Sequence, residues 1–251
     1  MAGNRPYTLS IAGFDPSGGA GILADIKTFE MNKVYGLGVI SGNTFQNDST
    51  FNAVDWIPLN KIMDQIQLLK NRFTIEYIKI GLIESFEILN VLISQLTSDF
   101  PHSKIIWDPI LKASAGFDFH KEIEKNLLET ICKSIYLITP NGSEVMELEA
   151  FTSPEENAKH LANFCHVFLK GGHDEINPGK DRLFTKDKKE FSFRPEQKKH
   201  FPKHGSGCIL SSALTAYLAR GFKLHRACLM AKQYTSKTLT SNSGLLAYHK
   251  P

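Results

Sequence analysis

The clearest candidate for chemistry in this sequence is the turn Gly205-Ser206-Gly207-Cys208, which runs directly into an apolar segment. Apolar residues recur there at helical intervals and predict one buried helix face: Leu210, Leu214, Tyr217 and Leu218. The first N–H groups of a helix have no intrahelical partner and lie at the positive end of its dipole, so the turn favours an anion. Cys208 stands where a thiolate would be favoured. The alternative is an ordinary helix start in which Cys208 is a small buried hydrophobe.

A second glycine-rich loop, residues 15–21, follows a short apolar strand expected at residues 7–14 and precedes a helix. Neither loop has the Gly-x-x-x-x-Gly-Lys-Ser/Thr pattern of a phosphate-binding P-loop. Gly36-Leu37-Gly38 precedes a strand and has its next glycine one place late, which excludes the dinucleotide fingerprint. A nicotinamide enzyme is therefore not expected.

Polar residues also stand at the ends of other expected strands, and most have an ordinary alternative role. Lys170 is either a site residue or an ordinary strand-end lysine, which is often only solvated. Glu144, three residues after Asn141, is either a site residue or an exposed acid in the first turn of a helix. Asp25 is either a site residue or a polar residue on the exposed side of its helix.

The elements that must position these residues alternate between strands and helices. Strands are expected at residues 7–14, 36–41, 77–80, 104–107, 136–139 and 167–170, with a hairpin of 182–185 and 190–193. Helices are expected from Ile22, at 58–73, 85–96, 120–132, 143–148 and 154–164, from Gly205, and at 224–239. This order predicts one three-layer α/β/α domain over residues 1–251 with a mainly parallel sheet. Its ligand would lie at the carboxyl ends of the strands.

Composition limits the remaining classes of function. The 251 residues are 42% hydrophobic and 22% charged, which is typical of a globular protein. A net charge of +3 does not indicate a nucleic-acid partner, and no apolar run has the length of a membrane span. The first residues do not resemble a signal peptide, and the four cysteines show no paired spacing. We therefore expect a cytoplasmic protein with reduced thiols.

The combined motifs resemble the ribokinase-like superfamily, and within it the hydroxymethylpyrimidine/phosphomethylpyrimidine kinases of thiamine biosynthesis. They come in that family's order along nearly the whole chain: residues 11–29, Gln46-Asn47, Lys79-Ile80-Gly81, Asp108-Pro109, Thr139-Pro140-Asn141 with Glu144, Lys170-Gly171-Gly172-His173, and residues 204–208. Three places depart from the family pattern, one of which is Lys112-Ala113-Ser114, a segment that only loosely follows the family's sequence after Asp-Pro. Phe14 replaces a small hydroxyl residue, and Pro202-Lys203 replaces an Asn-Thr type pair.

The resemblance implies a role for each candidate. Gly205, Ser206 and Gly207 would form an anion hole, and Cys208 would accept the proton of the substrate alcohol. ATP would contact Lys170, Asn141 and Asp108, with Mg²⁺ held through Glu144. The aminopyrimidine substrate would contact Gly13, Asp25 and Gln46, and the kinase would be a homodimer.

Two other functions fit the same residues. A pyridoxal kinase of this superfamily has a similar glycine-rich start and a Gly-x-Gly-Cys loop. A non-catalytic pyrimidine-binding protein could retain the fold without the activity. The intact turn and Lys170 favour an enzyme over the latter.

Overall fold

The chain is described by a computed structural model for residues 4–112, 119, 124–172, 178–195 and 201–250. His173 and the expected helix start at His120 lie outside these residues. The described residues form one nine-stranded sheet in the order β3-β2-β1-β4-β5-β6-β7-β8-β9. The strands are β1 Tyr7–Phe14, β2 Tyr35–Gln46, β3 Phe51–Trp56, β4 Ile75–Ile80, β5 Lys104–Trp107, β6 Leu137–Ile138, β7 His166–Leu169, β8 Asp181–Phe184 and β9 Glu190–Phe193.

The middle of this sheet is parallel. Strands β2, β1, β4, β5, β6 and β7 pair in parallel, whereas β3, β8 and β9 add antiparallel edges. The prediction of a mainly parallel sheet is therefore confirmed. The carboxyl ends of β4, β5, β6 and β7 thus lie along one edge, and Gly81, Asp108, Thr139 and Lys170 are the residues that directly follow them.

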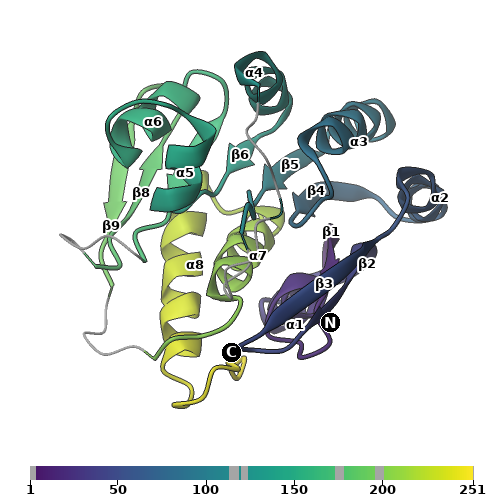
Figure 1. The fold of residues 1–251 in the computed structure, drawn as a ribbon, viewed down its shortest axis with the longest axis horizontal. Helices are drawn as coiled ribbons and strands as arrows, with labels where there is room; N and C mark the ends of the chain where they lie inside the picture. Colours follow the sequence, from purple (N-terminus) through teal and green to yellow (C-terminus); the bar gives the residue numbers. More distant parts are fainter. Residues whose placement is uncertain (1–3, 113–118, 120–123, 173–177, 196–200, 251) are drawn as a thin grey trace.

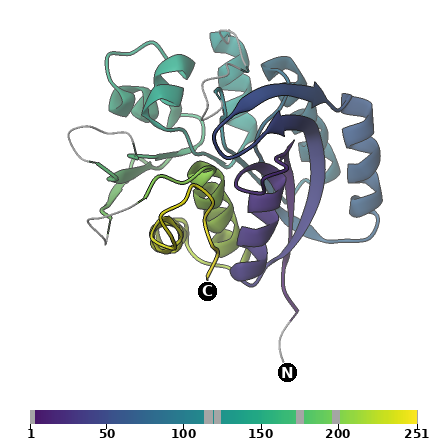
Figure 2. The same ribbon diagram turned by 60° about the horizontal axis from the view of Figure 1, so that its bottom comes forward.

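Helices cover both faces of the sheet, which makes the three layers seen in Figure 1 and Figure 2. The helices are α1 Gly21–Met31, α2 Leu59–Lys70, α3 Phe86–Asp99, α4 Lys125–Ser134, α5 Gly142–Leu148, α6 Pro154–Leu161, α7 Ser206–Ala219 and α8 Leu224–Leu239. Helices α1, α7 and α8 pack on one face, and α2 to α6 pack on the other.

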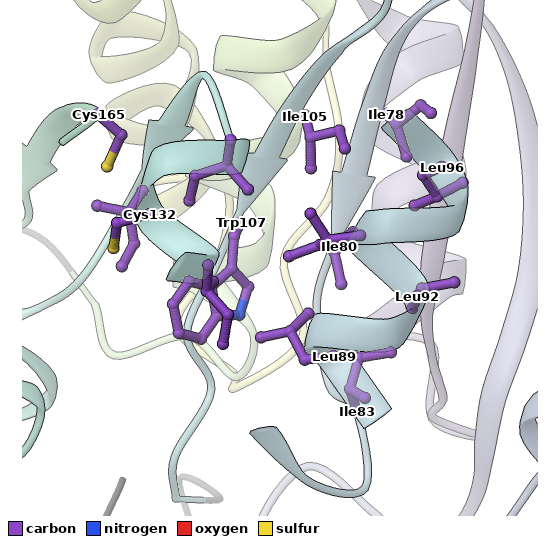
Figure 3. Packing of buried hydrophobic residues seen from close by; sticks show 14 of the residues in the cluster. Ile78, Ile80, Ile83, Leu89, Leu92, Leu96, Ile105, Trp107, Cys132 and Cys165 are labelled. Atoms are coloured by element: carbon purple, nitrogen blue, oxygen red, sulfur yellow. The ribbon is translucent and has the colours of Figure 1, made fainter. Parts of the chain in front are cut away.

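Alternation along the strands supplies both layers of the core. On β5, Ile105 and Trp107 face the layer of α3 and α4, while Ile106 faces the layer of α7 and α8. Figure 3 shows the first of these layers, where Leu92 and Leu96 of α3 lie against isoleucines of β4 and β5. Burying one such side chain stabilises the fold by about 1.5–3 kcal/mol.

Two regions differ from the sequence-based expectation. Strand β2 continues to Gln46, through a segment expected to be a loop, because it pairs there with the unpredicted edge strand β3. Helix α7 is buried on all sides from Cys208 to Leu218 rather than on one face, because the sheet, α1 and α8 enclose it. In the part of the chain that the structure describes, no helix is long and apolar enough to cross a membrane.

Candidate active site

The turn before α7 has the geometry expected of an anion-binding helix start. Gly205 is the N-cap of α7 with a φ of 72°, in the left-handed region that favours glycine. A Cβ at Gly205 would lie 2.1 Å from the carbonyl oxygen of Gly19 in the first glycine-rich loop. The two loops therefore touch through their backbones, and Ser206, Gly207 and Cys208 form the first turn, with their N–H groups outside the helical ladder.

Lys170 lies beside this turn and is not a solvated lysine. Its ammonium is 2.8 Å from Asp108 Oδ1 and 3.3 Å from Glu144 Oε2, and only 10% of its side chain is exposed. A Cβ built on Gly207 would lie 3.5 Å from Lys170 Nζ. Although burial opposes the charge, Asp108 and Glu144 raise the pKa of Lys170 above its ordinary value. A permanent cation thus adjoins the positive end of α7.

Asp108 connects this cation to α7 through hydrogen bonds. It accepts bonds from Thr139 Oγ1 at 2.9 Å and Ser211 Oγ at 3.0 Å, in addition to the bond from Lys170. Burial opposes its ionisation, but Lys170 and Lys79 hold the pKa of Asp108 below its ordinary range. Asp108 therefore acts on the site as a buried anion that fixes Lys170.

Asn141 and Glu144 form a capping box at the start of α5. Asn141 Oδ1 accepts a bond from Glu144 N at 2.8 Å, and Glu144 Oε2 accepts one from Asn141 N at 2.6 Å. The exposed-acid alternative is wrong, because only 12% of the Glu144 side chain is exposed. Burial, opposed by Lys170, raises the pKa of Glu144 to about 7. This group can therefore hold a proton or a cation near neutral pH.

Cys208 lies at a helix terminus that favours a thiolate, but its surroundings oppose one. The residue is 6% exposed, and burial raises the pKa of its thiol to about 11, although Lys79 and the Gly21 N–H oppose this shift. The sequence indicates the favourable helix terminus but not this desolvation. In this state Cys208 is a protonated thiol at neutral pH.

Asp25, predicted to contact the substrate, is fully buried beneath the site. Its carboxylate accepts bonds from Lys79 Nζ, Ser10 Oγ and Ser212 Oγ, each at 2.6 Å. The alternative of an exposed position on α1 is therefore wrong. Lys79 is also fully buried, and Asp25 raises its pKa against the effect of burial. The pairing of Lys79 with Asp25 was not predicted from the sequence, although an ionisable residue in an apolar strand was the available signal.

Gln46 and Gly13 lie near the start of the first glycine-rich loop, because both contact Thr44, whose hydroxyl donates to the Phe14 carbonyl oxygen. Gln46 ends β2 and is half-buried, and its Nε2 donates to Thr44 Oγ1 at 2.8 Å, while its carbonyl oxygen accepts no hydrogen bond from the residues that the structure describes. Gly13 packs against Leu82 and Thr44. A nearby open hollow of about 450 Å³ is lined by Phe14, Ile40, Asn43, Ile57 and Gln65, and by none of the predicted site residues.

The first glycine-rich loop is organised by Asp15, a second residue whose role the sequence analysis missed. Asp15 accepts bonds from the N–H groups of Ser17 and Ala20, each at 2.8 Å, and from His204 Nε2 at 2.8 Å. His204 is buried, not solvated as a loop histidine often is. Both residues lie within the quoted motifs, but their pairing depends on a contact 189 residues apart in sequence.

Comparison with known proteins gives one consistent family. The family described as phosphomethylpyrimidine kinase matches residues 15–251. The hydroxymethylpyrimidine/phosphomethylpyrimidine kinase of Haemophilus influenzae is 31% identical over 99% of this chain and 96% of its own length. The enzyme of the same name from Aquifex aeolicus is 31% identical over 94% of this chain and 95% of its own length.

Solved structures agree with this result. The phosphomethylpyrimidine kinase of Clostridium difficile is 30% identical, with a TM-score of 0.78 over 93% of this chain and 99% of that one. A Bacillus subtilis pyridoxal kinase, solved as an ADP complex, gives a TM-score of 0.83 over 98% of this chain and 97% of that one. Its identity is only 23%, so this second likeness supports the ribokinase-like fold alone.

Proposed function

Because the chain belongs to the phosphomethylpyrimidine kinase family, we propose that it transfers the γ-phosphoryl group of ATP to 4-amino-5-hydroxymethyl-2-methylpyrimidine and then to the resulting monophosphate. Its relatives are named hydroxymethylpyrimidine/phosphomethylpyrimidine kinases, and one further relative is named a thiamine biosynthesis bifunctional protein, so we assign this kinase to thiamine biosynthesis. We further propose that it acts in the cytoplasm as a homodimer.

The observation that carries this proposal is the meeting of Lys170 with the N-terminus of α7. The buried Lys170 ammonium lies next to the first backbone N–H groups of α7, because a Cβ built on Gly207 would be 3.5 Å from Lys170 Nζ. Phosphoryl transfer depends mainly on positioning and on stabilising the charge of the transferred group. This arrangement provides both functions for the terminal phosphates of ATP, with Asn141 and Asp108 beside them.

Glu144 and Asp108 fit the limited role that proteins play in binding magnesium. Mg²⁺ in kinases is usually held by one or two carboxylates, with phosphate oxygens and waters as its other ligands. The carboxylates of Glu144 and Asp108 both adjoin Lys170, so they lie where those phosphates would bind. When bound, the ion would neutralise phosphate charge.

The acceptor side is formed by Gly13, Gln46 and the first glycine-rich loop. The free carbonyl oxygen of Gln46 could accept a bond from the exocyclic amine of the pyrimidine, while its nitrogen is a donor. Cys208, in the first turn of α7, would face the primary alcohol and take its proton once its own thiol has ionised. Asp25 would support this region from below through Ser212 and Lys79.

A comparison of two alcohols in a kinase assay tests the proposal. The wild-type protein with ATP and Mg²⁺ is expected to phosphorylate the aminopyrimidine alcohol with a higher kcat/KM than pyridoxal, which has no exocyclic amine. A preference for pyridoxal would assign the chain to the other activity of this fold. Binding of either alcohol without turnover would identify a non-catalytic protein.

A further inference from the structure

A buried hydrogen bond between Asp15 and His204 joins the two glycine-rich loops of the site. His204 Nε2 donates to Asp15 Oδ2 at 2.8 Å, and His204 immediately precedes the N-cap Gly205. The same carboxylate accepts the N–H groups of Ser17 and Ala20, so it organises the whole first loop. Asp15 thus holds the first glycine-rich loop and, through His204, the turn before α7.

Close packing leaves no slack around this bond. The imidazole lies on Gly19, where a Cβ would be 2.6 Å from His204 Cδ2. A Cβ on Gly205 would meet the Gly19 carbonyl oxygen at 2.1 Å and Ala20 Cα at 2.7 Å. The loops therefore cannot approach further, and the hydrogen bond prevents them from separating.

The contact continues to the reacting groups. Gly21 follows Ala20 and begins α1, and its backbone N–H lowers the pKa of the nearby Cys208 thiol. The path from His204 through Asp15, Ala20 and Gly21 thus leads back to Cys208, four residues after His204. The lengths of these contacts determine the distance of Cys208 and the α7 N–H groups from the first glycine-rich loop.

The C-terminal segment holds His204 from the other side. The His204 N–H donates to Leu245 O at 2.9 Å, and Lys203 Nζ donates to Asn242 Oδ1 at 2.9 Å. Leu246 also packs against Gly19. The imidazole is therefore fixed by its backbone, its ring face and its Nε2.

We propose that Asp15 and His204 form a positioning pair that sets the distance and angle between the acceptor alcohol and the phosphate-binding turn, an inference that rests on the proposed kinase function. In this role both side chains act through the two loops, to which their hydrogen bonds are directed. Because the Asp15 carboxylate accepts the bond, His204 must carry its proton on Nε2. A side chain without that donor would break the link between the first glycine-rich loop and the turn before α7.

Three substitutions at position 204 separate this role from simple packing. His204→Leu fills the space but removes the donor. His204→Gln can place an amide nitrogen near the position of Nε2, whereas His204→Asn is one bond too short to reach Asp15. A matched control is His160→Leu. His160 lies on α6, away from the site, and its Nδ1 makes a similar 3.0 Å contact with Glu149.

We expect His204→Leu to lower kcat by about 10- to 100-fold, the effect of a small misplacement of reacting groups. The KM for ATP should stay within roughly threefold of wild type, because Lys170 and its carboxylates are untouched. His204→Gln should recover most of the kcat, and His204→Asn should not. His160→Leu should keep wild-type kinetics even if its melting temperature falls as much as that of His204→Leu.

Alkylation of Cys208 by iodoacetamide gives a second readout. If the two loops separate in His204→Leu, alkylation of Cys208 should be faster in that variant. The alkylation rate of His160→Leu should equal that of wild type. A folded His204→Leu protein with wild-type kcat and alkylation rate would overturn the proposal. If that variant does not fold, equal kcat values for His204→Gln and His204→Asn would overturn it. Absence of kinase activity in the wild-type protein would instead refute the proposed function.

Discussion

The pKa of Cys208 is the residue-scale property with the most direct consequence for mechanism. A thiol with a pKa near 11 cannot accept a proton until it loses its own. If Cys208 is the proton acceptor, its active form is scarce at neutral pH and increases about tenfold for each pH unit below the pKa. We therefore expect kcat to rise with pH from 7 to 9.5.

Cys208→Ala tests this expectation. Removal of a general base lowers kcat by roughly 10²–10⁴-fold, and the variant should show a flat pH profile. ATP binding should stay near normal, since backbone N–H groups and Lys170 remain. A variant that turns over within a few-fold of wild type, with the same pH profile, would show that the thiol only fills space.

Gln46 provides a residue-scale test of substrate placement. Gln46→Ala should weaken use of the pyrimidine by about 1–3 kcal/mol, the value of a buried hydrogen bond, with little change in ATP affinity. Gln65→Ala is the matched control, because Gln65 lines the neighbouring open hollow. A larger effect on pyrimidine KM from Gln65 than from Gln46 would move the acceptor site into that hollow.

At the scale of elements, the start of α7 depends on one glycine. Gly205→Ala would combine an unfavourable positive φ with a collision against Gly19 O. Gly221 supplies the control, since it has a φ of 84° with nothing within 4 Å of a built Cβ. Gly221→Ala should cost about 1–2 kcal/mol of unfolding free energy from backbone strain and leave kcat unchanged.

Gly205→Ala should cost more than that and also lower kcat, because relief of the collision must separate the two glycine-rich loops. Urea unfolding and steady-state kinetics measure the two effects. Equal losses of stability in the two variants, with unchanged kcat in both, would show that the contact between the loops is unimportant.

Sequence patterns predicted most elements but not their surroundings. Ser85 caps α3, since its side chain accepts the Ile88 N–H, and a serine at a helix start is a signal that can be found in the local sequence. Strand β3 was missed because an exposed edge strand has little apolar alternation. The pKa of Cys208 and the pairs Asp25–Lys79 and Asp15–His204 were missed because they depend on burial and on distant contacts.

At the scale of the whole molecule, the single sheet suggests one cooperative unit. Strands from β3 to β9 share one ladder, and α7 packs against both α1 and α8. We propose that residues 1–251 fold as one domain and expect coincident unfolding transitions by fluorescence and circular dichroism. Two separate transitions would contradict this proposal.

We propose that Lys170 and the N-terminus of α7 form one site for the terminal phosphates of ATP. Lys170→Met removes the cation. Lys70→Met is the matched control, because Lys70, the last residue of α2, also forms an ion pair, at 2.6 Å from Asp99 of α3. The measurement is kcat and the KM for ATP of both variants at saturating pyrimidine alcohol.

We predict that Lys170→Met raises the KM for ATP and lowers kcat by about 10²–10³-fold, the loss expected for one electrostatic group at a developing charge. Lys70→Met should match wild type in both parameters. A folded Lys170→Met protein with wild-type kcat and KM for ATP would contradict the assignment of this site.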